Sequence, residues 1–277
     1  METVPIQMPD GTTTPVRLFP GPDDASVIVV FPGLGIPAGY YEPFAEELVS
    51  RGFNAAIGEL RGQGDSRPRP SSDSTYGYHE LVALDFPAIF EVVRERFPAA
   101  TPFLLGHSMG GQLGVMYGAR IRGRLGGIVL VASGSPYHRG FPGIHAPRML
   151  VGAAAMSMTA NLAGFWPGDK LDIGGFGRQS KVLITDWSRF ARTGRIEPDG
   201  ADIDYEERIA RLTLPVLSVT VEGDDLAPES AAKNLLAKLP NADVTLWHQP
   251  QPLGHNGWIR EPASTVDRIV DWIHDHT

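Results

Sequence analysis

Residues 101–111 read TPFLLGHSMGG, and this stretch decides the fold. An apolar run typical of a buried strand comes before the serine, and a helical pattern follows it. Ser108 has Gly106 two residues before it and Gly110 two residues after it. A turn from strand to helix this sharp strains the backbone of its central serine and leaves no room for side chains at the two flanking positions. The pattern predicts that Ser108 is a nucleophile at a helix N-terminus, where the helix dipole favours developing negative charge.

On both sides of this turn, continuous apolar runs alternate with helical patterns. Strands are expected at 26–31, 53–57, 101–105, 127–132, 215–221 and 243–247, and helices at 43–51, 78–97 (kinked or restarted near Pro87), 109–120, 229–239 and 263–274. Runs at 4–8 and 14–19 flank Asp10-Gly11 and predict a hairpin. Strands that alternate with helices predict an α/β fold, with a mostly parallel central sheet and helices on both faces.

The segment 137–212 breaks this alternation. It is rich in Gly, Pro, Met and Trp, and its only helical patterns are at 149–163 and 185–193. We expect a cap or lid inserted between two strands of a core formed by 1–136 and 213–277. Six apolar residues of the segment are candidates either to line an acyl pocket or to pack the cap onto the sheet: Met149, Met156, Met158, Leu162, Phe165 and Trp166.

Length and composition narrow the class of protein. The 277 residues suit one large domain with an insertion, and the net charge of −8 argues against a nucleic-acid partner. The absence of cysteine excludes disulfides, thiolate catalysis and cysteine metal sites. The N-terminus does not resemble a secretory signal, and no apolar run is long enough for a membrane span. We therefore expect a cytoplasmic enzyme, and the composition leaves a homodimer open.

A serine hydroxyl needs a base within hydrogen-bond reach, and this motif is followed along the chain by an acid and then a histidine. Four histidines follow the strand expected at 215–221: His248, His255, His274 and His276. His255 is favoured because it lies in a glycine-flanked loop between the last strand and the last helix, whereas His248 ends a strand and the other two lie at the C-terminus. His107, on the tight turn beside the serine, is expected to be structural.

The acid has two candidates. Asp224 and Asp225 directly follow the strand at 215–221, and adjacent loop residues point in different directions, so one of them is expected to reach the histidine. The other is a candidate to cap the helix that begins near Pro228. Spacing alone does not separate the two.

At this point the chain resembles the α/β-fold hydrolases, in the branch of serine aminopeptidases and monoacylglycerol lipases. The resemblance covers most of the chain outside the cap and rests on FPGLG at 31–35, Tyr41, FA at 44–45, Leu48, RGF at 51–53, RGQGDS at 61–66, the Ser108 turn, the acid turn at 223–228, and GH at 254–255. The resemblance implies an α/β-hydrolase fold. It also favours Asp224, four residues before Pro228, as the acid, places the base at His255, and implies an oxyanion hole formed by the backbone N–H groups of Leu34 and Met109.

These residues predict a serine hydrolase that cleaves a small or medium ester, thioester or amide through an acyl-enzyme on Ser108, with no cofactor and no metal. Its partner is then a small acyl substrate. Acyl transfer and perhydrolysis use the same three residues and stay open. A second class of function, a ligand-binding protein with a slow or vestigial triad, is also compatible with this widely reused fold.

Overall fold

The computed structural model describes residues 1–121, 125–171 and 175–277, and its centre is an eight-stranded sheet. The strands are β1 (Glu2–Gln7), β2 (Thr13–Phe19), β3 (Val27–Phe31), β4 (Asn54–Gly58), β5 (Pro102–His107), β6 (Gly127–Val131), β9 (Val216–Val221) and β10 (Val244–Gln249). Their order is β1-β2-β4-β3-β5-β6-β9-β10. The pairs β1–β2 and β2–β4 are antiparallel and the rest are parallel. The predicted hairpin and mostly parallel sheet are confirmed.

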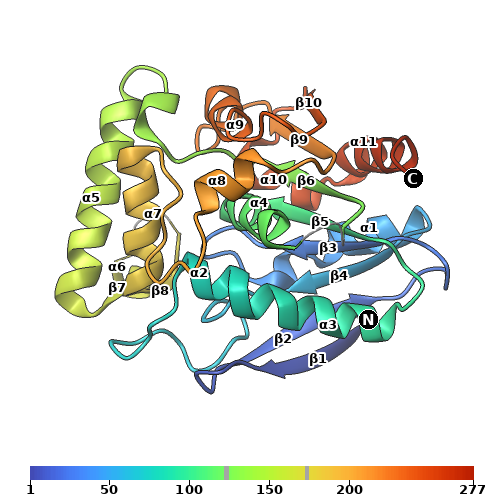
Figure 1. Cartoon of the computed structure of the whole chain (residues 1–277), viewed down its shortest axis with the longest axis horizontal. Helices are drawn as coiled ribbons and strands as arrows, with labels where there is room; N and C mark the ends of the chain where they lie inside the picture. The colour runs from blue at the N-terminus through green and yellow to red at the C-terminus, as the bar shows by residue number, and fades with distance from the viewer. Residues whose placement is uncertain (122–124, 172–174) are drawn as a thin grey trace.

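Helices cover both faces of the sheet (Figure 1). On one face lie α1 (Glu42–Ser50), α10 (Gly254–Arg260) and α11 (Ala263–His274), and on the other α3 (Phe86–Arg96), α4 (Met109–Arg120), α8 (Tyr205–Ala210) and α9 (Glu229–Leu236). The side chains of β3 alternate between the two cores, because Ile28 and Val30 contact the first set of helices while Val29 and Phe31 contact the second. This alternation explains why β3 is a continuous apolar run.

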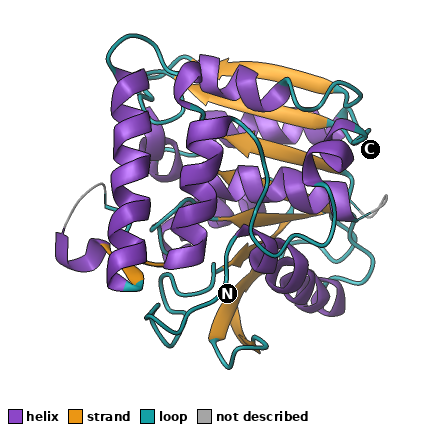
Figure 2. Ribbon diagram, turned by 60° about the vertical axis from the view of Figure 1, so that its left-hand side comes forward, coloured by secondary structure: helices purple, strands orange, loops and turns teal. Residues whose placement is uncertain are grey.

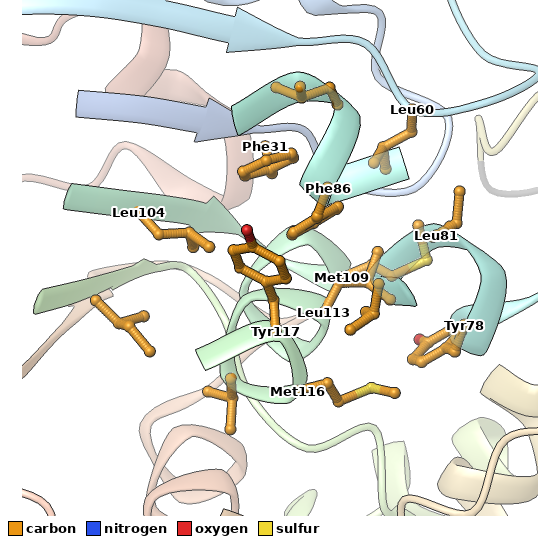
Figure 3. Packing of buried hydrophobic residues seen from close by; sticks show 14 of the residues in the cluster. Phe31, Leu60, Tyr78, Leu81, Phe86, Leu104, Met109, Leu113, Met116 and Tyr117 are labelled. Atoms are coloured by element: carbon orange, nitrogen blue, oxygen red, sulfur yellow. The ribbon is translucent and has the colours of Figure 1, made fainter. Parts of the chain in front are cut away.

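Aromatic packing fixes α4 against the sheet (Figure 3). This helix follows the sharp strand-to-helix turn at Ser108, called the elbow below. The rings of Phe31 and Phe86 stack with centroids 3.6 Å apart, and the rings of Phe90 and Tyr117 stack at 5.0 Å. Phe86 also lies edge-on to Tyr117, with centroids 5.4 Å apart. This buried cluster connects β3, α3 and the second half of α4, so the helix is held against the sheet by large apolar contacts as well as by the turn at its start.

The restart expected near Pro87 is confirmed. A short helix α2 (Tyr78–Glu80) leads into a π-helical turn at Leu81–Asp85, and α3 then begins with Pro87 as its second residue. The N–H of Phe86 donates to the carbonyl oxygen of Leu81, five residues back, so the wider π-helical turn ends where Pro87 has no N–H to donate.

Between β6 and β9, the described residues form seven elements: a 3₁₀ turn at His138–Gly140, α5 (His145–Ala163), β7 (Phe165–Pro167), α6 (Gly168–Leu171), β8 (Arg178–Ser180), α7 (Lys181–Thr193) and α8. The expectation of only two helices in this segment was therefore wrong. Helix α8 has only six residues, too few to show a clear apolar period in the sequence. Asp204 caps it by accepting the N–H of Glu207 at 3.0 Å. Residues 172–174 of the expected cap lie outside the described residues, and its boundaries at 137 and 212 stay a prediction.

Helices α5 and α7 lie side by side at one end of the sheet, away from the two chain termini (Figures 1 and 2). A buried carboxylate attaches them to the core, because Asp186 of α7 accepts the N–H of Tyr78 at 3.1 Å and that of Asp199 at 2.9 Å. None of the helices in the described ranges is long and apolar enough to cross a membrane.

Gly106 gives a direct test of the close backbone packing at the elbow. A Cβ on Gly106 would lie 2.4 Å from the carbonyl oxygen of Gly110 and from the backbone of Gly111. We expect Gly106→Ala to lower the free energy of unfolding by about 3 kcal/mol, because backbone must shift to make room. Urea denaturation followed by circular dichroism measures this change.

Gly152 of α5 is the matched control, since nothing lies within 4 Å of a Cβ at that position. There, Gly152→Ala should stabilise the protein by up to about 1 kcal/mol through helix propensity. Equal stability of the two alanine variants would contradict the proposed clash at the elbow.

Candidate active site

The backbone of Ser108 has the strained geometry that the motif predicts. Its φ is 52° and its ψ is −120°, a combination that non-glycine residues seldom adopt, and it directly precedes the first residue of α4. The N–H of Ser108 donates to the carbonyl oxygen of Val131 at 3.2 Å, and the hydroxyl of Ser133 donates to the Ser108 carbonyl oxygen at 2.7 Å. These contacts hold the turn from the neighbouring strand β6.

The structure brings Ser108, His255 and Asp224 into one hydrogen-bonded chain. The Nε2 atom of His255 lies 3.0 Å from Ser108 Oγ, and its Nδ1 atom lies 2.9 Å and 3.0 Å from the two carboxylate oxygens of Asp224. With Nδ1–H donated to Asp224, Nε2 is left free to accept the serine proton. The Asp224 side chain is fully buried and that of His255 is 12% exposed, so the carboxylate is shielded from water and the imidazole opens on the cavity.

The prediction that His255 lies in a loop was wrong, because His255 is in the first turn of α10. The preceding Gly254 has φ 59°, and its N–H donates to the carbonyl oxygen of Glu222 at 3.0 Å. This bond joins the turn after β10 to the acid turn after β9. The glycine that looked like a loop signal in the sequence therefore supports a tight entry into a short helix.

The structure separates the two candidate acids. Besides contacting His255, Asp224 accepts the N–H groups of Leu226 and Ala227, both at 2.9 Å. Asp225 is exposed and has no hydrogen bond or ion pair in the described part of the chain. We expected one aspartate to bond the histidine and the other to cap the helix near Pro228. The structure differs, because Asp224 bonds both His255 and the backbone N–H groups that precede Pro228.

The remaining candidate bases lie elsewhere. His248 contacts Thr220 at 3.0 Å and Glu222 at 3.1 Å on the surface, and His276 bonds the carbonyl oxygen of Trp272 at 2.7 Å. His274 is exposed at the end of α11. None of the three contacts Ser108.

His107 is buried and structural, as expected, yet its contacts reach both sides of the site. Its Nδ1 lies 2.6 Å from the hydroxyl of Tyr41, which in turn accepts the N–H of Gly33 at 3.0 Å, and its Nε2 lies 3.0 Å from the carbonyl oxygen of His255. Burial holds the pKa of His107 well below its ordinary value, so the ring is neutral. Nothing in the sequence indicates the hydrogen bond between Tyr41 and His107.

The two predicted oxyanion donors, Leu34 and Met109, both line the same cavity as Ser108. In the described part of the chain, no protein acceptor is bonded to the N–H of either residue. The amides on each side of Leu34 are both occupied, Gly33 by Tyr41 and Gly35 by the side-chain oxygen of Gln63. Gln63 belongs to the RGQGDS motif, and sequence reasoning gave it no role.

The cavity beside Ser108 has a volume of about 570 Å³ and is mostly apolar. Core and cap both contribute to its lining: Leu34, Ile36, Met109 and Gln112 from the core, and Phe141, Met149, Ala153, Met156, Trp166 and Trp187 from the cap.

Three of the six apolar cap residues singled out from the sequence, Met149, Met156 and Trp166, line this cavity. Met158 and Leu162 neither line it nor pack the cap, because they lie on the outer face of α5 and are 63% and 83% exposed. Within the described ranges, no three His, Asp or Glu side chains gather closely enough to hold a metal ion.

The sequence profile of the family described as serine aminopeptidase, S33, matches residues 22–182, more than half of the chain. The chain belongs to this family. It is thus an α/β hydrolase, and the class of enzyme expected from the sequence, a serine hydrolase of the esterase and lipase type, is confirmed.

Relatives extend the S33 likeness over nearly the whole chain. The monoacylglycerol lipase of Mycolicibacterium smegmatis is 26% identical over 266 residues, which cover 93% of this chain and 91% of that protein. Two solved structures share the fold: a bromoperoxidase from Bacillus anthracis (TM-score 0.66, 16% identity, 99% of this chain and 100% of that one) and a thermophilic esterase from Thermogutta terrifontis (TM-score 0.63, 16% identity, 100% and 99%).

The two aspartates of this S33 hydrolase offer a matched pair of variants. In Asp224→Asn the amide no longer accepts two backbone N–H groups and the Nδ1–H of His255 in the same way, which favours the wrong tautomer of the imidazole. We expect kcat on an activated ester to fall on the order of 10⁴-fold. Asp225→Asn should leave kcat within about twofold, because Asp225 lines the cavity but forms no hydrogen bond with Ser108 or His255. Steady-state kinetics on both purified variants measures this, and a comparable loss in Asp225→Asn would contradict the assignment of Asp224.

Proposed function

We propose that the protein hydrolyses carboxylic esters through an acyl-enzyme on Ser108. The observation that carries the proposal is the hydrogen-bonded chain of Ser108, His255 and Asp224, with the N–H groups of Leu34 and Met109 on the same cavity. A nucleophile, a base, an orienting acid and two donors for an oxyanion are the parts that acyl transfer requires.

In the first half-reaction, Ser108 Oγ attacks the ester carbonyl carbon while His255 Nε2 takes the serine proton. The carbonyl electron pair moves onto oxygen, where the N–H groups of Leu34 and Met109 stabilise it. Asp224 holds the resulting imidazolium by its Nδ1–H. When the tetrahedral intermediate collapses, the same proton passes from His255 to the leaving alcohol, and the acyl group remains on Ser108.

In the second half-reaction, His255 takes a proton from water as the water oxygen attacks the acyl carbon. The second tetrahedral intermediate is stabilised by the same two N–H groups. Its collapse breaks the bond to Ser108 Oγ, which regains its proton from His255, and the carboxylic acid leaves.

The cavity supports an apolar acyl group of medium length as the substrate part bound next to Ser108. A volume of about 570 Å³ lies within the range of small-ligand pockets, and its walls are mainly Leu, Ile, Met, Phe and Trp side chains. The named activity of the mycobacterial relative, monoacylglycerol lipase, also supports an ester of an apolar acyl group.

A fluorophosphonate probe separates an active hydrolase from a binding protein of the same fold. We expect the probe to label the wild type at Ser108, and Ser108→Ala to lose both labelling and on the order of 10⁴–10⁶-fold in kcat. Ser135 is a second serine on the cavity, and Ser135→Ala serves as the control that should still be labelled. A folded wild type that resists the probe would refute the proposed function.

A chain-length series of p-nitrophenyl esters tests the acyl site. Each CH₂ that enters the apolar cavity should raise kcat/KM roughly fourfold, which corresponds to about 0.8 kcal/mol, until the chain outgrows the cavity. Gly152 lines the cavity and has open space around it, so Gly152→Phe should shorten the best chain and leave acetate hydrolysis unchanged. Gly152→Ala is the control. If both variants kept the wild-type chain-length profile, the acyl group would bind elsewhere.

A further inference from the structure

Two buried glutamines from distant parts of the chain meet beside residues 33–35, the loop that carries the Leu34 N–H and is called the oxyanion loop below. Gln63 lies in the core loop after β4 and is 2% exposed, and Gln179 lies in the cap strand β8 and is 1% exposed. The side-chain oxygen of Gln63 accepts the N–H of Gly35. The same oxygen lies 3.3 Å from Nε2 of Gln179, which also donates to the carbonyl oxygen of Phe176 at 2.6 Å.

The cap backbone also contacts the oxyanion loop directly. Gly35 has φ 78°, and a Cβ at this residue would lie 2.5 Å from the backbone of Phe176. The backbone of the cap therefore rests on the face of Gly35, while the carbonyl oxygen of Phe176 is held by Gln179. Contact and hydrogen bonds join the same two segments, the oxyanion loop of the core and the end of the cap that leads into β8.

Burying these two glutamine side chains costs free energy of folding. The Nε2 atom of Gln63 and the Oε1 atom of Gln179 are buried and have no hydrogen-bond partner in the described part of the chain. An unpaired buried polar atom costs about 1–3 kcal/mol, whereas apolar side chains of the same shape leave none unpaired. A purely structural role is better served by methionine, which has the length of glutamine and no amide. The amides instead orient one group, the N–H of Gly35.

We propose that Gln63 and Gln179 are positioning residues that couple the seated cap to the oxyanion hole. The proposal rests on the proposed function, because Gly35 adjoins Leu34, whose N–H is the donor to the developing oxyanion. Holding the N–H of Gly35 fixes the peptide plane between Leu34 and Gly35, and Tyr41 fixes the plane between Pro32 and Gly33. The plane that carries the Leu34 N–H lies between these two. The Leu34 N–H then keeps its direction toward the substrate oxygen. A donor moved by about 1 Å in such a site can lose on the order of 10²-fold in rate.

The two glutamines differ in how directly they contact the loop. Gln63 touches the loop itself, and Gln179 acts on the loop only through Gln63 and through Phe176. The loss from the cap residue should therefore be smaller than the loss from the core residue, and the two should not add.

The test replaces each glutamine by methionine. Gln63→Met should remain folded and melt within a few degrees of the wild type, because it removes the unpaired Nε2 atom but leaves the N–H of Gly35 without its acceptor. It should nevertheless lose about 10–100-fold in kcat, with KM changed by less than about twofold. Gln179→Met should lose roughly 3–10-fold, and the double variant should lose no more than Gln63→Met alone. Gln249→Met is the control, because Gln249 is also fully buried but its side chain contacts Thr265 and the backbone of Gln251, away from the cavity; its kcat should stay at the wild-type value.

A boronic acid that forms a tetrahedral adduct with Ser108 gives a second readout. Its inhibition constant should rise in Gln63→Met by about the factor that kcat falls, because the adduct needs the oxyanion donors and the ground-state ester does not. Wild-type kcat in Gln63→Met, a rise in KM alone, or an unchanged inhibition constant would each overturn the coupling while leaving the proposed function intact. A wild type that neither reacts with the fluorophosphonate probe nor hydrolyses esters would remove both.

Discussion

The close approach of backbone at the start of α4 is the constraint on which the rest of the site depends. A Cβ on Gly110 would lie 2.3 Å from the carbonyl oxygen of Phe31, so α4 begins directly against the end of β3. The chain that leaves β3 is the oxyanion loop, with Leu34 three residues after Phe31. One steric requirement, glycine at the second position after Ser108, thus sets the distance between Ser108 and the N–H of Leu34, one of the two proposed oxyanion donors. A larger residue would move α4 and separate them.

The parallel sheet supplies the other partners. Because β3, β5, β9 and β10 run in the same direction, their carboxyl ends meet at one edge, and the segments that follow them carry Leu34, Ser108, Asp224 and His255 in turn. Residues up to 221 positions apart in the sequence become neighbours without any long loop. The bond from the Gly254 N–H to the Glu222 carbonyl then fixes the last two loops to each other, so the acid and the base cannot shift independently.

Most of the sheet and the residues of the site could be predicted from the sequence, because buried parallel strands and the elbow have strong local signals. Three points could not. Spacing does not separate the adjacent Asp224 and Asp225; the family resemblance favoured Asp224, and the turn geometry places it, buried, against His255. The first turn of α10 was hidden by Gly254, whose positive φ reads as a loop. The role of Gln63 depends on Gln179, 116 residues away, and no local pattern reports such a contact.

The cap adds a constraint that a site built on the core alone would lack. Its walls define the cavity, and its backbone at Phe176 rests on Gly35 of the oxyanion loop. A displacement of β8 therefore either breaks the contact at Gly35 and the hydrogen bond between Gln179 and Gln63, or moves the oxyanion loop together with β8. Substrate selection and transition-state stabilisation then share one set of contacts. In such an arrangement, a change at Phe176 or in β8 that fits a different acyl group also changes the direction of an N–H donor, so KM and kcat are not tuned separately at these positions.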